Sequence, residues 1–165
     1  MKISKDKKLC EEYIGKHPVI SISLKGINAA SYEAAFELTV KTIKGAVQKA
    51  GFLKMSDKLD EDEKKEYRAI LDENMSEATL FWSLKNLSEL LEKHYETKVI
   101  LLIDEYDVPL AKAFENGYYD KMVFLIRNLL EQTLKTNNSL KFAVMTGCMR
   151  ISKESIFTGL NNLKV

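Results

Sequence analysis

Two adjacent carboxylates follow an apolar segment in the middle of the chain. The segment is VILLI (residues 99–103), the pair is Asp104-Glu105, and a third carboxylate, Asp107, comes two positions later. Neighbouring acids can divide the work of a nucleotide-hydrolysing site, since one holds Mg²⁺ through water while the next polarises the attacking water. The alternative is structural, because acids that follow a strand often cap the next helix. Both interpretations stay open on these residues alone.

A second apolar segment, LKFAVMT (residues 140–146), ends in Thr146, and Arg150 follows shortly after it. The carboxyl ends of parallel strands lie at one edge of a sheet, where ligands bind, so we expect Thr146 near Asp104. A polar residue at such a position can sense the γ-phosphate of a nucleotide. Arg150 could stabilise transition-state charge or simply pair with a surface acid, and the sequence favours neither role.

A metal-dependent nuclease site is a less favoured interpretation of Asp104, Glu105 and Asp107. Such a site needs acids from other elements and usually a nearby lysine, and Lys112 is the one candidate. Nucleophilic catalysis is unsupported, because no serine has histidine and aspartate partners at recognisable positions.

Alternating strands and helices would position these residues. Period-two alternation predicts a strand over 19–24, and the continuous apolar run predicts that 99–103 is a strand buried on both faces. The expected elements are a helix over 5–14 (capped by Ser4), the strand 19–24, helices over 32–50 (capped by Ser31) and 59–74, a helix that starts at Ser76, the strand 99–103, a short helix capped by Asp107 or a neighbour and holding Pro109, a helix over 118–136, the strand 140–146, and the beginning of a strand at 163–165. This order predicts an α/β protein with a parallel sheet.

Composition limits the classes of function that remain. The 165 residues fit one domain, and a formal net charge of +1 does not indicate nucleic acid as a partner. The longest apolar runs are the length of a strand and too short to span a membrane, and the start of the chain does not resemble a signal peptide. Cys10 and Cys148 lack metal-like spacing, so we expect buried, reduced cysteines and a cytoplasmic protein.

The acidic motif and the Thr146 segment together resemble a known family. VILLIDEYDVPL, followed about forty residues later by VMTGCMRISKESIFTGLNNL, resembles the bacterial predicted AAA-ATPase-like family, and so does the leading KISKDKKLCEEYIGKHPVISISLKGI. The resemblance implies a P-loop NTPase-like, three-layer α/β/α fold with a parallel sheet, and ATP and Mg²⁺ as cofactors. It implies that Asp104 is the Mg²⁺-associated acid, that Glu105 activates water, and that Thr146 lies in the sensor region. It assigns no role to Arg150. Members commonly carry a nuclease-like domain of the PD-(D/E)XK superfamily after the ATPase region.

The sequence departs from this family at the phosphate-binding loop. No Gly-x-x-x-x-Gly-Lys-Ser/Thr is present, and the one Gly-Lys pair, Gly15-Lys16, leads into a strand instead of opening a helix. We therefore expect residues 1–165 to be a partial AAA-ATPase-like domain that lacks the first strand and the phosphate loop, with impaired ATP hydrolysis. Strand 99–103 should lie between the other two, and 140–146 should be an exposed edge that favours self-association. The alternative is a non-catalytic interaction module that docks a partner supplying the missing half.

Overall fold

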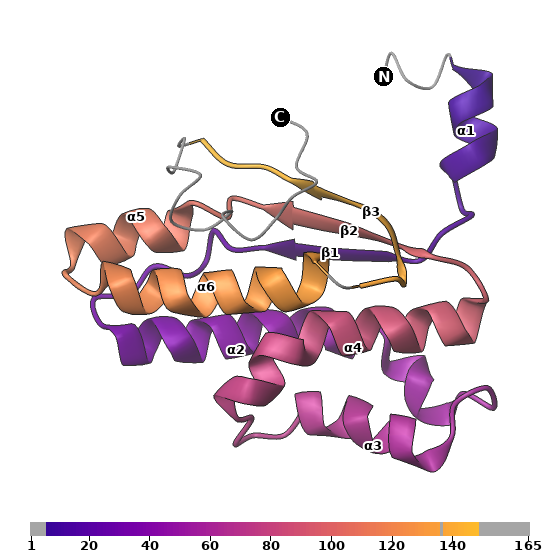
Figure 1. Cartoon of the computed structure of the whole chain (residues 1–165), viewed down its shortest axis with the longest axis horizontal. Coiled ribbons are helices and arrows are strands. Elements are labelled where there is room, and N and C mark those ends of the chain that lie inside the picture. Colours follow the sequence, from indigo (N-terminus) through magenta and orange to yellow (C-terminus); the bar gives the residue numbers. More distant parts are fainter. Residues whose placement is uncertain (1–5, 136, 149–165) are drawn as a thin grey trace.

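A three-stranded parallel sheet forms the centre of the computed structural model, which describes residues 6–135 and 137–148. Its strands are β1 (Val19–Ser23), β2 (Val99–Asp104) and β3 (Leu140–Met145), in the spatial order β1-β2-β3. Ser23 pairs with Asp104, and Ile103 pairs with Met145, so the three carboxyl ends lie side by side (Figure 1). This confirms the expected parallel α/β arrangement with the 99–103 strand in the middle.

Helices connect the strands. They are α1 (Lys7–Tyr13), α2 (Tyr32–Gln48), α3 (Glu61–Ile70), α4 (Glu77–Tyr95), α5 (Val108–Glu115) and α6 (Tyr119–Leu134), with a short 3₁₀ helix, η2 (Gly51–Met55), before α3. Ser31 and Ser76 cap α2 and α4 as expected, because each side chain accepts a hydrogen bond from a backbone amide in the first turn. The sequence interpretation missed η2 and made the 59–74 helix too long at both ends.

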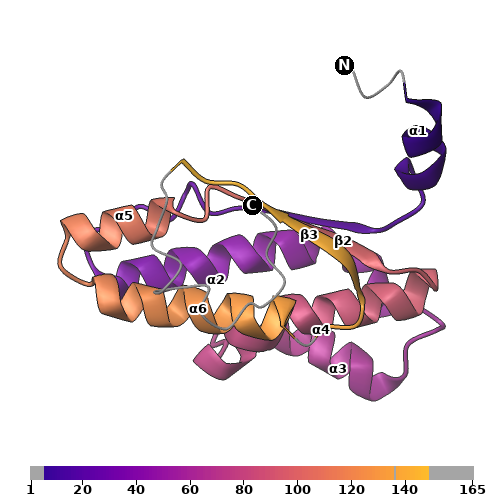
Figure 2. The same cartoon turned by 45° about the horizontal axis from the view of Figure 1, so that its top comes forward.

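One face of the sheet is covered by helices α2, α4 and α6, and α3 packs on α4 farther from the sheet (Figures 1 and 2). The buried side chains of this face include Ile20, Ile22, Leu101 and Ile103, none more than 4% exposed. Tyr67 of α3 is fully buried, and its hydroxyl donates to the Val47 carbonyl of α2 at 2.9 Å. The core of the described residues therefore lies between one sheet face and the helices.

The opposite face of the sheet is largely uncovered by the described residues. Its exposed apolar side chains are Val19 (53%), Leu102 (37%), Phe142 (39%) and Val144 (44%). The exposure of Leu102 corrects the expectation that 99–103 is buried on both faces. Within the described residues the layers are a sheet and helices on one side of it, so a three-layer sandwich is not formed there.

Two smaller expectations also change. Helix α1 begins at Lys7, where Asp6 caps it, while Ser4 and residues 163–165 lie outside the described residues. Cys10 is half-buried and Cys148 is exposed, so the expectation that both are buried was wrong; neither forms a disulfide. No helix in the described part of the chain has the length and apolar character that crossing a membrane requires.

Candidate functional site

Asp104 and Thr146 meet at the carboxyl edge of the sheet, although 42 residues separate them in sequence. Asp104 is the last residue of β2, and Thr146 directly follows β3. The Thr146 hydroxyl donates a hydrogen bond to Oδ1 of Asp104. The expectation that these two side chains lie close together is confirmed, and the parallel pairing of β2 with β3 is its cause.

Glu105 adds the second acid in an unusual backbone conformation. Its φ is +53°, a left-handed value that disfavours residues other than glycine. The turn is held on both sides, because Leu24 N donates to the Asp104 carbonyl at 2.9 Å and Tyr106 N donates to the Thr146 carbonyl at 3.2 Å. Such strained residues concentrate at functional sites, where the surrounding structure maintains them.

Lys25 is a residue that the sequence interpretation missed. It lies in the turn after β1, and its Nζ is 4.0 Å from Oε1 of Glu105. The Lys25 side chain is 77% exposed, so this pair contributes little to stability. The available signal was its position, since Lys25 follows the carboxyl end of a third parallel strand. Ser23 is at the same edge, opposite Asp104 in the register.

Asp107 does not join the other two acids. It occupies the N-cap position of α5, with Pro109 in the first turn as expected, but its side chain makes no capping hydrogen bond. Its Oδ2 accepts instead from the backbone amide of Cys148 at 2.9 Å. Within the described ranges no group of three or more acids, histidines or cysteines could hold a metal ion, which disfavours a three-carboxylate nuclease site at Asp104, Glu105 and Asp107.

The donor atoms at this edge suit Mg²⁺ as part of a site shared with a phosphate ligand. The side chains of Asp104, Glu105 and Thr146 offer only oxygen, the element that this cation prefers. Asp104 and Thr146 are exposed and Glu105 is half-buried, so water and an incoming ligand can reach them. Mg²⁺ commonly binds through one or two carboxylates together with water and substrate phosphates, so one or two acids are sufficient. Arg150 lies outside the described residues.

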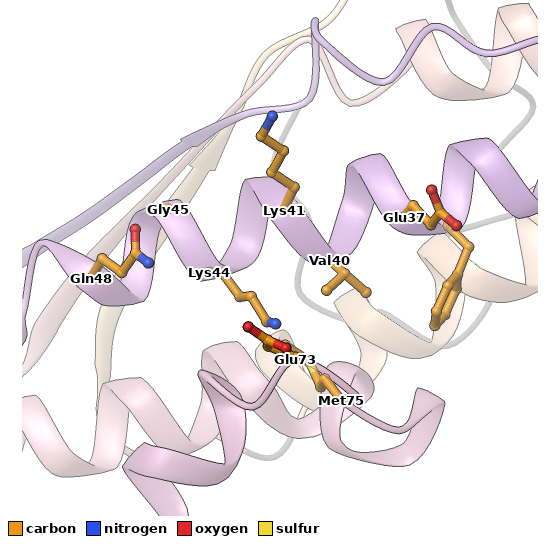
Figure 3. A pocket seen from close by; sticks show the side chains of 9 residues that line it. Glu37, Val40, Lys41, Lys44, Gly45, Gln48, Glu73 and Met75 are labelled. Carbon is orange, nitrogen blue, oxygen red and sulfur yellow. The ribbon is translucent and has the colours of Figure 1, made fainter.

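A separate groove runs along α2. Its wall includes Lys41 and Lys44 of α2 and the segment that carries Glu73 and Met75, and Figure 3 shows Lys44 directed toward Glu73. The groove contains two lysines and two glutamates, which leaves no net charge to attract an ion. None of Asp104, Glu105 and Thr146 lines it, so it has no part in the chemistry of the sheet edge.

Comparisons with known proteins give a family but no solved fold. A family model described as "Predicted AAA-ATPase" matches residues 2–157. A protein of Azotobacter chroococcum mcd 1, described as "Uncharacterized protein in vnfD 5'region", is 32% identical in an alignment of 75 positions that covers 40% of this chain and 13% of that protein. The chain thus aligns with a small part of that relative's length. No solved structure matches.

Proposed function

The chain belongs to the predicted AAA-ATPase family, and from this membership we propose that the carboxyl edge of its sheet is the acidic half of a Mg²⁺–ATP site. Asp104 is the Mg²⁺-associated acid, Glu105 orients and polarises the attacking water, and Thr146 holds Asp104 and senses the terminal phosphate. The observation that carries the proposal is the Thr146–Asp104 hydrogen bond between the ends of two parallel strands. A P-loop NTPase-like fold is the architecture that this arrangement fits best.

When bound, Mg²⁺ would neutralise charge that develops on the phosphates. The protein side chains have separate tasks around it. Asp104 supplies a carboxylate at the edge. The left-handed backbone of Glu105 ends the extended course of β2, so the Glu105 carboxylate follows a different direction from the side chains of the strand. Lys25, beside Glu105, supplies a nearby positive charge. Arg150 remains a proposed source of further positive charge toward the transition state.

The phosphate-holding half of the site must come from a Gly-x-x-x-x-Gly-Lys-Ser/Thr segment, which the 165 residues do not contain. We therefore expect no measurable ATP hydrolysis by these residues alone, in an assay of phosphate release with Mg²⁺. Turnover that Glu105→Gln abolishes in the same protein would contradict this expectation, because it would show a complete site.

Calorimetric titration with Mn²⁺, a substitute for Mg²⁺, tests the acidic half directly. We expect weak binding that Asp104→Asn lowers by about tenfold, the loss typical when a ligand or its immediate partner is removed. Glu73→Gln is the matched control, since it removes an acid on the α2 groove and should leave the affinity unchanged. Equal affinities for wild type and Asp104→Asn would overturn the assignment of Asp104.

The sheet face that the described residues leave uncovered favours a second function, that of a docking module. Leu102, Phe142 and Val144 expose apolar side chains there, and a polypeptide that carries the phosphate loop is the partner expected to cover them. Val144→Asp should abolish such an association, whereas Phe114→Asp on α5, equally apolar and 74% exposed, should not. A monomer that binds no loop-bearing polypeptide would argue against this function.

A further inference from the structure

Among the described residues, Asp107 is the one charged residue that is buried. It is 3% exposed, and it lies in the turn that follows β2. A carboxylate at a helix N-cap ordinarily accepts from amides of the first helical turn, but this one makes no such bond. Its Oδ2 accepts from Cys148 N, 41 residues away, in the segment that follows β3. The carboxylate therefore links two strand ends and leaves its own helix uncapped.

Gly147 allows this link by having no side chain. A Cβ atom at residue 147 would lie 2.7 Å from Oδ1 and 3.0 Å from Cγ of Asp107, and 2.9 Å from Cε1 of Tyr106. Distances this short are not tolerated between such atoms, so the backbone of residues 147–148 can approach the carboxylate only with glycine at 147. The pKa of Tyr106 is raised, first by burial and second by the neighbouring Asp107 charge, which agrees with a carboxylate packed at this turn.

Two backbone hydrogen bonds complete the connection. Thr146 N donates to the Ile103 carbonyl at 2.9 Å, and Tyr106 N donates to the Thr146 carbonyl at 3.2 Å. Thr146 thus lies between the last ladder bond of the sheet and the Asp107–Cys148 bond. Its hydroxyl is the group that reaches Asp104. Loss of the Asp107 carboxylate would remove the contact that holds residues 147–148 beside the end of β2.

We propose that Asp107 and Gly147 form a clasp that positions Thr146 against Asp104. Asp107 acts here as a positioning residue, because its carboxylate holds the 147–148 backbone next to Thr146. The β2–β3 pairing ends at Ile103 and Met145, and the clasp holds the two chains together beyond these residues. The part of this inference that concerns Mg²⁺ rests on the function proposed for Asp104.

Amide spectroscopy of the full chain tests the clasp without any ligand. In ¹H–¹⁵N spectra, Asp107→Ala should shift the Cys148 and Thr146 signals, because the carboxylate acceptor is lost. Asp107→Asn keeps an acceptor oxygen and should shift them less. Asp72→Ala is the control, since Asp72 Oδ1 accepts from Asn74 N at 2.8 Å in an exposed turn after α3. This variant should shift signals near residue 74 and leave residues 146 and 148 unchanged.

Mn²⁺ affinity supplies the second readout. We expect Asp107→Ala to weaken Mn²⁺ binding severalfold, approaching the roughly tenfold loss that follows removal of an outer hydrogen-bonding partner of a metal site. Asp107→Asn should keep most of the wild-type affinity, because it keeps an acceptor oxygen. Gly147→Ala, which leaves Asp107 intact but forces the backbone away from it, should weaken Mn²⁺ binding to a similar extent and shift the Tyr106 amide signal, and it serves if Asp107→Ala does not fold; an unchanged Tyr106 signal there would overturn the clasp.

The possible results separate the two proposals. Unchanged Thr146 and Cys148 signals in Asp107→Ala would overturn the clasp, whatever the metal affinity. Wild-type protein that binds no Mn²⁺ at Asp104 would overturn the proposed function, and the amide shifts would then decide the clasp alone.

Discussion

Glu105 carries the largest backbone constraint among the residues of the sheet edge. Its φ of +53° places an ordinary side chain in a region where glycine is preferred. The Leu24–Asp104 and Tyr106–Thr146 backbone bonds on either side hold the turn in this form. The side chain gains little in return from Lys25 at 4.0 Å, because that lysine is exposed. The left-handed turn thus does not stabilise the protein through the Glu105 side chain. The direction that it gives the Glu105 carboxylate is the better explanation.

Glycine at this position should therefore stabilise the protein. We expect Glu105→Gly to raise the free energy of unfolding by up to about 1 kcal/mol, measured by urea denaturation, since it removes the left-handed strain. Glu96, with φ of +55° at the end of α4, is the matched control, and Glu96→Gly should change stability in the same direction without affecting Mn²⁺ binding. A clear loss of stability in Glu105→Gly would contradict this account of the turn.

Helix α4 is the element that supports the middle of the sheet. It packs on β2, α6 and α3, and it buries the leucines at positions 80, 84, 87 and 91. Its first turn is closed by Ser76, whose Oγ accepts from Thr79 N at 3.1 Å and shares a 2.8 Å hydrogen bond with the Thr79 hydroxyl. Because α4 leads directly into β2, the stability of its start affects the strand that carries Asp104.

Loss of this cap should be measurable in the whole protein. Ser76→Ala is expected to lower the free energy of unfolding by about 1 kcal/mol in urea denaturation, because the Thr79 amide loses its acceptor. Ser76→Asp keeps an acceptor at the same place and should remain within about 0.5 kcal/mol of wild type. Equal losses in both variants would show that the serine acts through packing and not through its hydrogen bond.

The sequence predicted most elements because local signals agreed with the fold. Ser31 and Ser76 mark helix starts, and the apolar runs before Asp104 and Thr146 mark the two strands that meet. It did not predict η2, whose single 3₁₀ turn has no periodicity to detect. Lys25 was missed because an exposed lysine carries no pattern of its own, and only the strand pairing brings it to Glu105.

Asp107 shows the limit of local reasoning most clearly. Its position before Pro109 predicts a helix cap, and the backbone does place it at the N-cap. The side chain turns to Cys148 because the β2–β3 pairing places the Gly147–Cys148 backbone against it. A contact between residues 41 apart depends on sheet register, which no local signal around residue 107 specifies. The apolar run 99–103 likewise did not reveal that Leu102 is exposed on the sheet face that the described residues leave uncovered.

At the scale of the whole molecule, charge and layer arrangement point to an edge site. The formal net charge is +1, so no long-range field directs a charged ligand, and local groups must provide selectivity. Helices cover one sheet face, and the three carboxyl ends bring together Lys25, Asp104, Glu105 and Thr146 from three strands. Membership of the predicted AAA-ATPase family supports the Mg²⁺–ATP ligand that we propose for this edge.

Paramagnetic broadening by Mn²⁺ in ¹H–¹⁵N spectra of the full chain tests the central claim most directly. We predict that the amide signals of Asp104, Glu105 and Thr146 broaden first, that excess Mg²⁺ reverses this, and that Asp104→Asn requires about ten times more Mn²⁺ for the same broadening. The acidic first turn of α3, at residues 61–63, is an internal control, since Glu61 and Asp62 are exposed there but have no role at the sheet edge. Broadening at residues 61–63 with none at 104, 105 and 146, or a pattern unchanged in Asp104→Asn, would contradict the assignment of this edge as a Mg²⁺ site.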